Sequence, residues 1–172
     1  MPITVRMLRP DDDRGRFSSN NLEIDRFFQR FAGQNQFRHQ IGTTYVAIDD
    51  VEIVGYVTVA ASQIEIADLP KTRRGKLPRY PLPVLRLARL GVDQRVQRQG
   101  LGLLLLRATF ALAHQMADEF GCVGVVVDAK PEAVSFYSRY GFCVLEDVLQ
   151  GALGERPEPV PMFLELSAIP RQ

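Results

Sequence analysis

The first third of the chain alternates hydrophobic and polar residues in a way that predicts strands around one short helix. Three segments predict strands, namely residues 3–8, 43–48 and 53–61. Residues 22–31 instead carry apolar side chains at helical spacing, and Gly33 fits the end of that amphipathic helix. Asp49 and Asp50 separate the last two strands, which therefore predict a β-hairpin.

The rest of the chain predicts four strands and two helices. The strands are residues 84–92, 122–127, 142–145 and 161–166. The long helix covers residues 101–120, and its apolar stripe consists of Leu101, Leu104, Leu105, Ala108, Leu112, Met116 and Phe120. Gly121 suits its end, and a second helix runs from Pro131 to about Tyr140 before Gly141. The order β-α-β-β-β-α-β-α-β-β predicts an α/β fold, a mixed α+β sheet with helices on its faces.

Composition adds little to this pattern. The 172 residues carry a formal net charge of +1, so we expect one domain, residues 1–172, with no overall attraction to nucleic acid or membrane. No signal peptide or membrane span is predicted, and a cytoplasmic protein is the default expectation. Cys122 and Cys143 lie in apolar runs and are expected to be buried structural thiols rather than ligands of a metal.

One sector of the chain is strongly basic. Residues 71–98 contain nine Lys or Arg residues and a single acid, Asp93. A neutral protein with one basic sector suits an anionic ligand bound locally, although residues 71–79 alone could equally be a solvated loop.

The segment Gln97-Arg98-Gln99-Gly100-Leu101-Gly102 lies between a predicted strand and the long helix. The first N–H groups of a helix lack internal partners, and the helix dipole adds partial positive charge there. The two glycines allow a close backbone approach, and Arg95 and Arg98 add charge. The segment therefore predicts a turn that binds a diphosphate. Leu105 replaces the third glycine of the dinucleotide fingerprint, and no Gly-Lys-Ser/Thr follows as in a P-loop.

The pattern Gln/Arg-x-x-Gly-x-Gly/Ala between a strand and a long helix resembles the GNAT superfamily of N-acetyltransferases. Residues 88–92 resemble that family's central strand, and residues 133–142 resemble its late helix and final strand. The resemblance implies a mostly antiparallel central sheet of six to seven strands, flanked by helices and containing a splayed strand pair. It also implies acetyl-CoA as the cofactor.

The resemblance further implies which residues hold the cofactor. The main chain of Leu90, Gly91 and Val92 would bind the pantetheine, and Ala133 and Phe136 would line it. The amides of the turn would bind the diphosphate, namely those of Gln97, Arg98, Gln99, Gly100, Leu101, Gly102 and Leu103. Lys130 stands where many relatives have Asn, so it is not expected to bind the pantetheine.

Acetyl transfer to an amine needs a polarised carbonyl and a proton for the departing thiolate. In the family, a tyrosine at the position of Tyr137 donates that proton, and a phenol with a pKa of about 10 can protonate a thiolate whose acid has a pKa of about 8.5. The alternative role for Tyr137 is a core side chain, as expected for Tyr140. A backbone amide near Val92 would polarise the carbonyl. Glu65 and Asp68 are expected to be solvated, and His39 and His114 structural, which leaves no evident general base.

Residues 77–85 and 88–90 look like one GNAT branch, the toxins that acetylate the amino group of aminoacyl-tRNA. That branch implies a dimer and an antitoxin protein as partners. Five arginines would contact tRNA phosphates: Arg73, Arg74, Arg79, Arg86 and Arg89. The neutral net charge speaks against tRNA. The leading hypothesis is still an acetyl-CoA-dependent N-acetyltransferase that transfers the acetyl group directly to a primary amine, with aminoacyl-tRNA as a candidate acceptor. Two alternatives remain beside it: an N-acetyltransferase for a small-molecule or protein amine, and a CoA-binding module without turnover.

Overall fold

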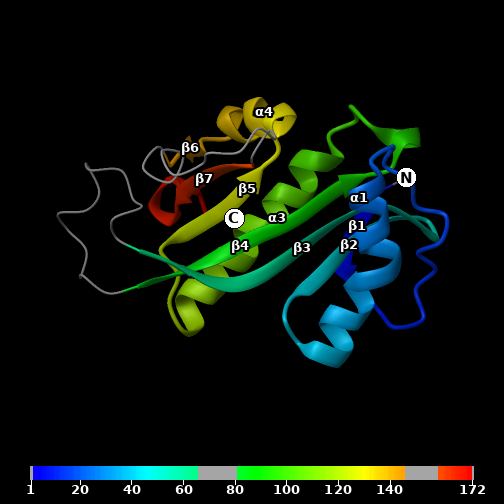
Figure 1. Cartoon of the computed structure of the whole chain (residues 1–172), viewed down its shortest axis with the longest axis horizontal. Coiled ribbons are helices and arrows are strands. Elements are labelled where there is room, and N and C mark those ends of the chain that lie inside the picture. The colour runs from blue at the N-terminus through cyan, green and yellow to red at the C-terminus, as the bar shows by residue number, and fades with distance from the viewer. Residues whose placement is uncertain (1, 66–80, 146–158, 172) are drawn as a thin grey trace. The chain divides into compact units, whose positions relative to one another are not determined.

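The described strands form a single mixed sheet of seven strands. The structure, a computed structural model, describes residues 2–65, 81–145 and 159–171. The strands follow one another across the sheet in the order β1-β2-β3-β4-β5-β7-β6 (Figure 1). Most neighbouring strands are antiparallel, β4 and β5 are parallel, and helices flank the sheet. The predicted fold class is therefore confirmed.

The elements appear in the predicted order. The strands are β1 Ile3–Met7, β2 Thr43–Asp49, β3 Glu52–Ile64, β4 Leu82–Val92, β5 Gly124–Ala129, β6 Cys143–Val144 and β7 Val160–Glu165. The α-helices are α1 Leu22–Arg26, α3 Leu101–Glu119 and α4 Val134–Arg139. The π-helices are η1 Phe27–Phe31 and η2 Gln34–His39, and the 3₁₀ turns are η4 Gln94–Val96, η5 Pro131–Ala133 and η6 Leu166–Ala168. No described helix is long and apolar enough to cross a membrane.

The chain divides into two compact units. The first consists of Met1–Ala60 and Leu87–Thr109, and the second of Ala61–Arg86 and Phe110–Gln172. In the first unit the predicted hairpin is confirmed, since β2 pairs antiparallel with β3 and Asp50 adopts the left-handed conformation (φ 59°) in the turn. β1 adds antiparallel to the other edge of β2.

Two consecutive residues of β3 anchor helices on opposite faces of the first unit. Tyr56 is fully buried among Phe17, Phe28 and the apolar residues of β2. On the opposite face, a Cβ added at Gly55 would lie 3.1 Å from Leu105 of α3, so the glycine lets the helix approach closely. Side chains alternate between faces along a strand. The hairpin is therefore covered by α1 and η1 on one side and by the start of α3 on the other.

The first helical segment is longer than the sequence predicts. Gly33 has helical dihedral angles (φ −65°), and the segment continues to His39 before Gln40 turns left-handed (φ 56°). A Cβ at Gly33 would lie 2.7 Å from the Arg14 guanidinium, which donates to Phe28 O at 3.3 Å. The glycine thus makes room for Arg14 instead of ending the helix, and His39 lies within the helical segment.

The second unit is built on antiparallel pairs. β5 pairs with β7 in register Gly124↔Glu165, and β6 pairs with the same strand β7. β5 is almost entirely buried, as its apolar run predicts. Cys122 is buried and its thiol donates to Gly124 O at 3.2 Å, whereas Cys143 is exposed, so the burial predicted for Cys143 is wrong.

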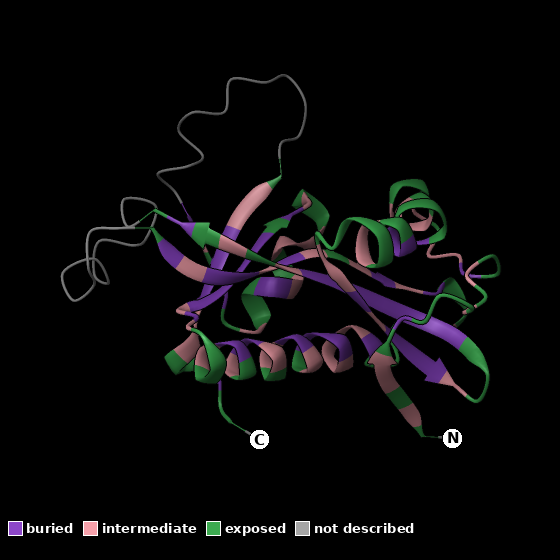
Figure 2. Ribbon diagram, turned by 90° about the horizontal axis from the view of Figure 1, so that it is seen from below, coloured by how far each residue is buried: buried purple, intermediate pink, exposed green. Residues whose placement is uncertain are grey.

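Helix α3 is buried along one side and exposed along the other (Figure 2). Its buried residues are Leu101, Leu105, Leu106, Thr109, Ala113 and Met116. The predicted stripe was therefore slightly misplaced, and Phe120 is wrong because its side chain is 70% exposed beyond the helix end. Gly121 (φ 108°) ends the helix as predicted, and Gly141 (φ 100°) follows α4 in the same way.

Candidate active site

The carboxyl end of β4 is tightly packed at Gly91. A Cβ on this residue would lie 2.5 Å from Ile24 Cγ2 and 3.0 Å from Tyr56 Cε1. The first distance is shorter than real Cβ contacts and the second is at their tight limit, so only glycine fits without movement of its neighbours. Leu90 and Val92 on either side are half-buried. The strand end where the pantetheine was predicted is thus held firmly against the aromatic core of the first unit.

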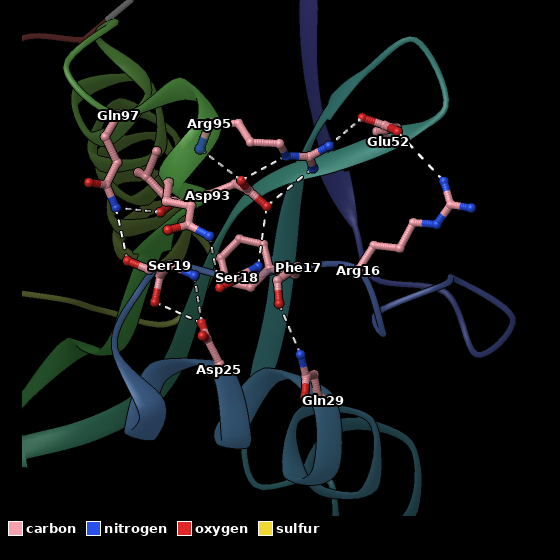
Figure 3. A network of polar contacts seen from close by, with 12 residues as sticks. Arg16, Phe17, Ser18, Ser19, Asp25, Gln29, Glu52, Asp93, Arg95 and Gln97 are labelled. Carbon is pink, nitrogen blue, oxygen red and sulfur yellow. Dashed lines mark hydrogen bonds and ion pairs between the residues drawn. The ribbon is translucent and has the colours of Figure 1, made fainter.

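Asp93, directly after β4, organises the turn that leads to α3. Its side chain is 1% exposed and accepts hydrogen bonds from Ser18 N at 3.2 Å and Arg95 N at 2.9 Å. The Arg95 guanidinium forks onto both carboxylate oxygens at 2.9 and 3.2 Å (Figure 3). Burial by itself raises the pKa of Asp93, but the hydrogen bonds from Arg95 and Ser18 outweigh it, and the pKa lies below its usual value.

Arg95 is therefore engaged in the protein. Besides Asp93 it contacts Glu52 at 3.1 Å, and Glu52 also lies 3.9 Å from Arg16 (Figure 3). The sequence predicted that Arg95 adds positive charge to a bound diphosphate. Because its guanidinium is already shared by two carboxylates, Arg95 supplies little net charge to the turn.

The side chain of Gln97 bonds to protein backbone rather than pointing away. Its Nε2 donates to Val92 O at 3.1 Å and to Ser19 O at 2.9 Å (Figure 3). One amide group thereby links the end of β4 to the N-terminal segment ahead of α1.

The helix start has the form that an anion-binding turn requires. The first helical hydrogen bond runs from Leu104 N to Gly100 O at 3.0 Å, so the N–H groups of Leu101, Gly102 and Leu103 precede it. Arg98 and Gly100 both have positive φ, 65° and 85°. No heavy atom of the described residues lies within 4 Å of the place where a Cβ on Gly100 would stand. Open space beside amides that lack an intrahelical partner, at a helix N-terminus, fits a diphosphate.

Tyr137 lies on α4 in the second unit. Its side chain is 6% exposed and packs edge-to-face against Phe136 and Phe142, with ring centres 5.1 and 5.4 Å away. Burial raises the pKa of the Tyr137 phenol above its ordinary value of 10.0. The hydroxyl therefore stays protonated at any physiological pH. The residues predicted to line the pantetheine from this unit, Ala133 and Phe136, are half-buried.

The predicted substrate arginines have different surroundings. Arg86 donates to Asp128 at 2.6 Å within the second unit. Arg89 is exposed, and its guanidinium carbon lies 5.1 Å from the centre of the Phe27 ring in the first unit. Arg73, Arg74 and Arg79 lie outside the described residues, as do most of the basic loop and Asp68.

Sequence reasoning missed the polar network around Asp93. Ser18 and Ser19 contribute to it from a segment more than seventy residues away in the chain, and Asp25 in turn holds Ser19. The signal that the sequence did offer was Asp93, the single acid within the basic sector. A buried carboxylate is usually paired with a cation, so a neighbouring arginine could have been expected to hold it. Within the described residues, no cluster of His, Cys, Asp or Glu is placed to hold a metal ion.

Comparison with known families identifies the class of protein. Residues 16–152 match the model of the acetyltransferase (GNAT) domain. The chain therefore belongs to the GNAT acetyltransferase family, as the turn, the strand before it and the fold indicate. The predictions of an acyl-transferring enzyme and of acetyl-CoA as its cofactor are confirmed.

The individual proteins that this chain resembles indicate a narrower group within the family. A curated relative, the tRNA-acetylating toxin of Mycobacterium tuberculosis (strain ATCC 25618 / H37Rv), is 33% identical over 138 residues, which are 80% of this chain and 82% of the toxin. The solved structure of AtaT complexed with acetyl-methionyl-tRNAfMet has a TM-score of 0.84 at 25% identity and covers 98% of this chain and 97% of AtaT. The structure of AtaTR bound with AcCoA has a TM-score of 0.77 at 25% identity, covering 97% and 95%.

Proposed function

We propose that this protein transfers the acetyl group of acetyl-CoA to the amino group of an aminoacyl-tRNA and so acts as a toxin on translation. The observation that carries the proposal is the open helix start at Gly100 in a chain 33% identical to a tRNA-acetylating toxin over four fifths of its length. Similarity to AtaT, solved with acetyl-methionyl-tRNAfMet, supports the same acceptor class.

The chain's own backbone would hold the donor. Acetyl-CoA supplies the acetyl group as an activated thioester. We assign its diphosphate to the N–H groups of residues 97–103, which the helix dipole makes favourable for an anion. We assign its pantetheine to the main chain of Leu90, Gly91 and Val92, with Ala133 and Phe136 beside it. A backbone N–H near Val92 would polarise the acetyl carbonyl as charge develops on its oxygen.

Tyr137 is the proposed general acid. Its raised pKa keeps the proton on Oη at physiological pH, so the phenol is in the protonated form that can donate to the departing thiolate. The attacking amine needs no dedicated base in this scheme, because a free α-amine has a pKa of about 7.7–8.0 and a large share of it is neutral near pH 8.

Arg89 is the described arginine best placed for an RNA acceptor. It is exposed on β4, two residues before Gly91. Arg86 is also assigned to the acceptor, although its ion pair with Asp128 competes for the guanidinium. Arg73, Arg74 and Arg79 complete the proposed phosphate-binding set.

The protein's assembly is part of the same proposal. One acetyltransferase domain of residues 1–172 is expected to work in the cytoplasm, where aminoacyl-tRNA is found, and to form a homodimer. An antitoxin protein is the expected partner, since AtaT and KacT have been solved with antitoxin AtaR and as a KacTA–DNA complex.

Label transfer from radioactive acetyl-CoA tests the proposal. Charged tRNA, the same tRNA after deacylation, and a panel of small amines and peptides are offered in parallel. We expect label on charged tRNA only. If a small amine or peptide were labelled with a higher kcat/KM than charged tRNA, that amine would be the acceptor instead of tRNA. If no amine were labelled, the protein would be a CoA-binding module without turnover.

A further inference from the structure

Four hydrogen bonds join the segment before α1 to the turn before α3. Ser18 N donates to Asp93, and Gln94 N donates to Ser18 O at 2.8 Å. Gln97 Nε2 donates to Ser19 O, while Gln94 Nε2 reaches Ser18 Oγ only at 3.5 Å. Residues 16–19 therefore act as a strap across the turn, and Figure 3 shows the strap and the turn facing each other around Asp93.

The strap is itself fixed at its other end. Ser19 N and Oγ both donate to Asp25 Oδ1, at 2.8 and 2.7 Å. Phe17 is 2% exposed in the aromatic core, and its carbonyl accepts from Gln29 Nε2 at 2.9 Å. The turn is thus tied through the strap to α1 and η1, which are themselves packed on the hairpin.

The turn needs such support. Arg98 is a non-glycine residue in the left-handed region, a strained conformation that persists only where surrounding contacts impose it. Gly100 follows with φ 85°. Between Asp93 and these two residues, the Gln97 side chain supplies fixed points at Val92 O and Ser19 O.

We propose that Gln97 and Asp93 are positioning residues that hold the helix-start amides of residues 100–103 in place for the diphosphate of acetyl-CoA. Gln97 acts through its side chain, and the strap of residues 16–19 is a working part of the cofactor site. The inference rests on the proposed role of those amides in binding the donor. Preorganised donors bind an anion better than donors that must be ordered on binding.

The test compares Gln97→Leu, which removes both side-chain donors, with Gln97→Arg, which keeps N–H groups able to reach both carbonyls. Gln94→Leu is the matched control, because Gln94 is exposed in the same turn and its side chain makes only the long contact with Ser18. Each variant is titrated with acetyl-CoA by calorimetry and assayed with acetyl-CoA and with S-acetylpantetheine, which lacks the diphosphate.

We expect Gln97→Leu to raise the Kd and KM for acetyl-CoA about five- to tenfold, the value of one or two net hydrogen bonds. The kcat at saturation should stay within about twofold, S-acetylpantetheine should be used as well as by the unsubstituted protein, and Gln97→Arg should restore the affinity. Asp93→Asn should act in the same direction.

Two outcomes would overturn the inference. One is an unchanged Kd for acetyl-CoA in Gln97→Leu. The other is an equal loss of kcat/KM with acetyl-CoA and with S-acetylpantetheine, which would mean that the substitution disturbs the end of β4 rather than the diphosphate site. If the unsubstituted protein itself bound no acetyl-CoA, the proposed function would fail instead. Measurement at least about 20 °C below each variant's Tm separates a positioning effect from partial unfolding.

Discussion

The Arg89 guanidinium carbon lies 5.1 Å from the centre of the Phe27 ring. A cation held over an aromatic face at this distance is attracted by the ring. Phe27 in turn stacks on Tyr56, which is fully buried and donates its hydroxyl proton to Ile24 O at 2.8 Å. A buried tyrosine thus fixes the ring that orients an exposed arginine near the end of β4.

Removal of that ring should weaken acceptor binding without affecting the donor. We expect Phe27→Leu to raise the KM for the acceptor about two- to fivefold, since an exposed cation–π contact contributes about 0.5–1 kcal/mol. The Kd for acetyl-CoA should not change. Phe31→Leu is the matched control, because Phe31 lies in the same helical segment with its side chain 44% exposed. If Phe27→Leu still raises the KM for the acceptor in an Arg89→Ala background, the ring does not act through the arginine.

Tyr137→Phe should lower kcat at least about tenfold, because the departing thiolate would lose its proton donor. Acetyl-CoA should bind as before, since the ring and its packing on Phe136 and Phe142 are kept. Tyr140→Phe, at the half-buried C-cap of the same helix, should keep the original rate. Equal rates for the two variants in a steady-state assay would remove Tyr137 from the chemistry.

Stability should fall at alkaline pH. Burial raises the pKa values of Tyr56 and Tyr137 in the folded state above the ordinary 10.0. The folded protein then binds more protons than the unfolded chain above about pH 10, so the free energy of unfolding decreases as pH rises further. Urea titrations at successive pH values measure this, and Tyr137→Phe should reduce the slope. A stability independent of pH above 10 would contradict the burial of both phenols.

Alanine substitutions at the two glycines of the site should have different effects on acetyl-CoA binding. Gly91→Ala forces a Cβ to within 2.5 Å of Ile24, and overpacking of this kind costs about 1–3 kcal/mol, so its Tm should fall. Gly100→Ala meets no described atom within 4 Å, but alanine at φ 85° is strained by about 1–2 kcal/mol, and its added methyl group stands in the open space beside the helix start. We therefore expect a similar loss of Tm but a larger loss of acetyl-CoA affinity. Thermal melts beside calorimetric titrations distinguish the two, and identical profiles would be evidence against the assigned diphosphate position.

How much the sequence predicts depends on whether a feature is local. The order of elements, the hairpin and the stops at Gly121 and Gly141 follow from patterns within a few residues. Gly33 was misread because its reason is the Arg14 guanidinium, and a distant packing partner leaves no local signal. The motif predicts a ligand contact for the Gln97 amide, but it carries no local signal for the bond between the Gln97 side chain and Ser19.

Activity on tRNA should decline steeply with salt, because phosphate contacts release counterions. Arg89→Ala should reduce the slope of log(kcat/KM) against log[salt] by about one. Arg86→Ala should change it less, since Asp128 already accepts from Arg86 at 2.6 Å. Charge reversal at Arg73, Arg74 and Arg79 should abolish most of the activity. Indifference of the rate to both salt and charge reversal would argue for a small amine as the acceptor.

The most direct measurement is the mass of the reaction product. Charged tRNA is incubated with the protein and acetyl-CoA, digested with ribonuclease, and the aminoacyl-adenosine from its 3′ end is analysed by mass spectrometry. We expect this fragment to gain the mass of one acetyl group on its amino nitrogen, at a rate that Tyr137→Phe reduces. An unmodified aminoacyl-adenosine, under conditions where the same protein sample binds acetyl-CoA, would contradict the proposed acetyl transfer.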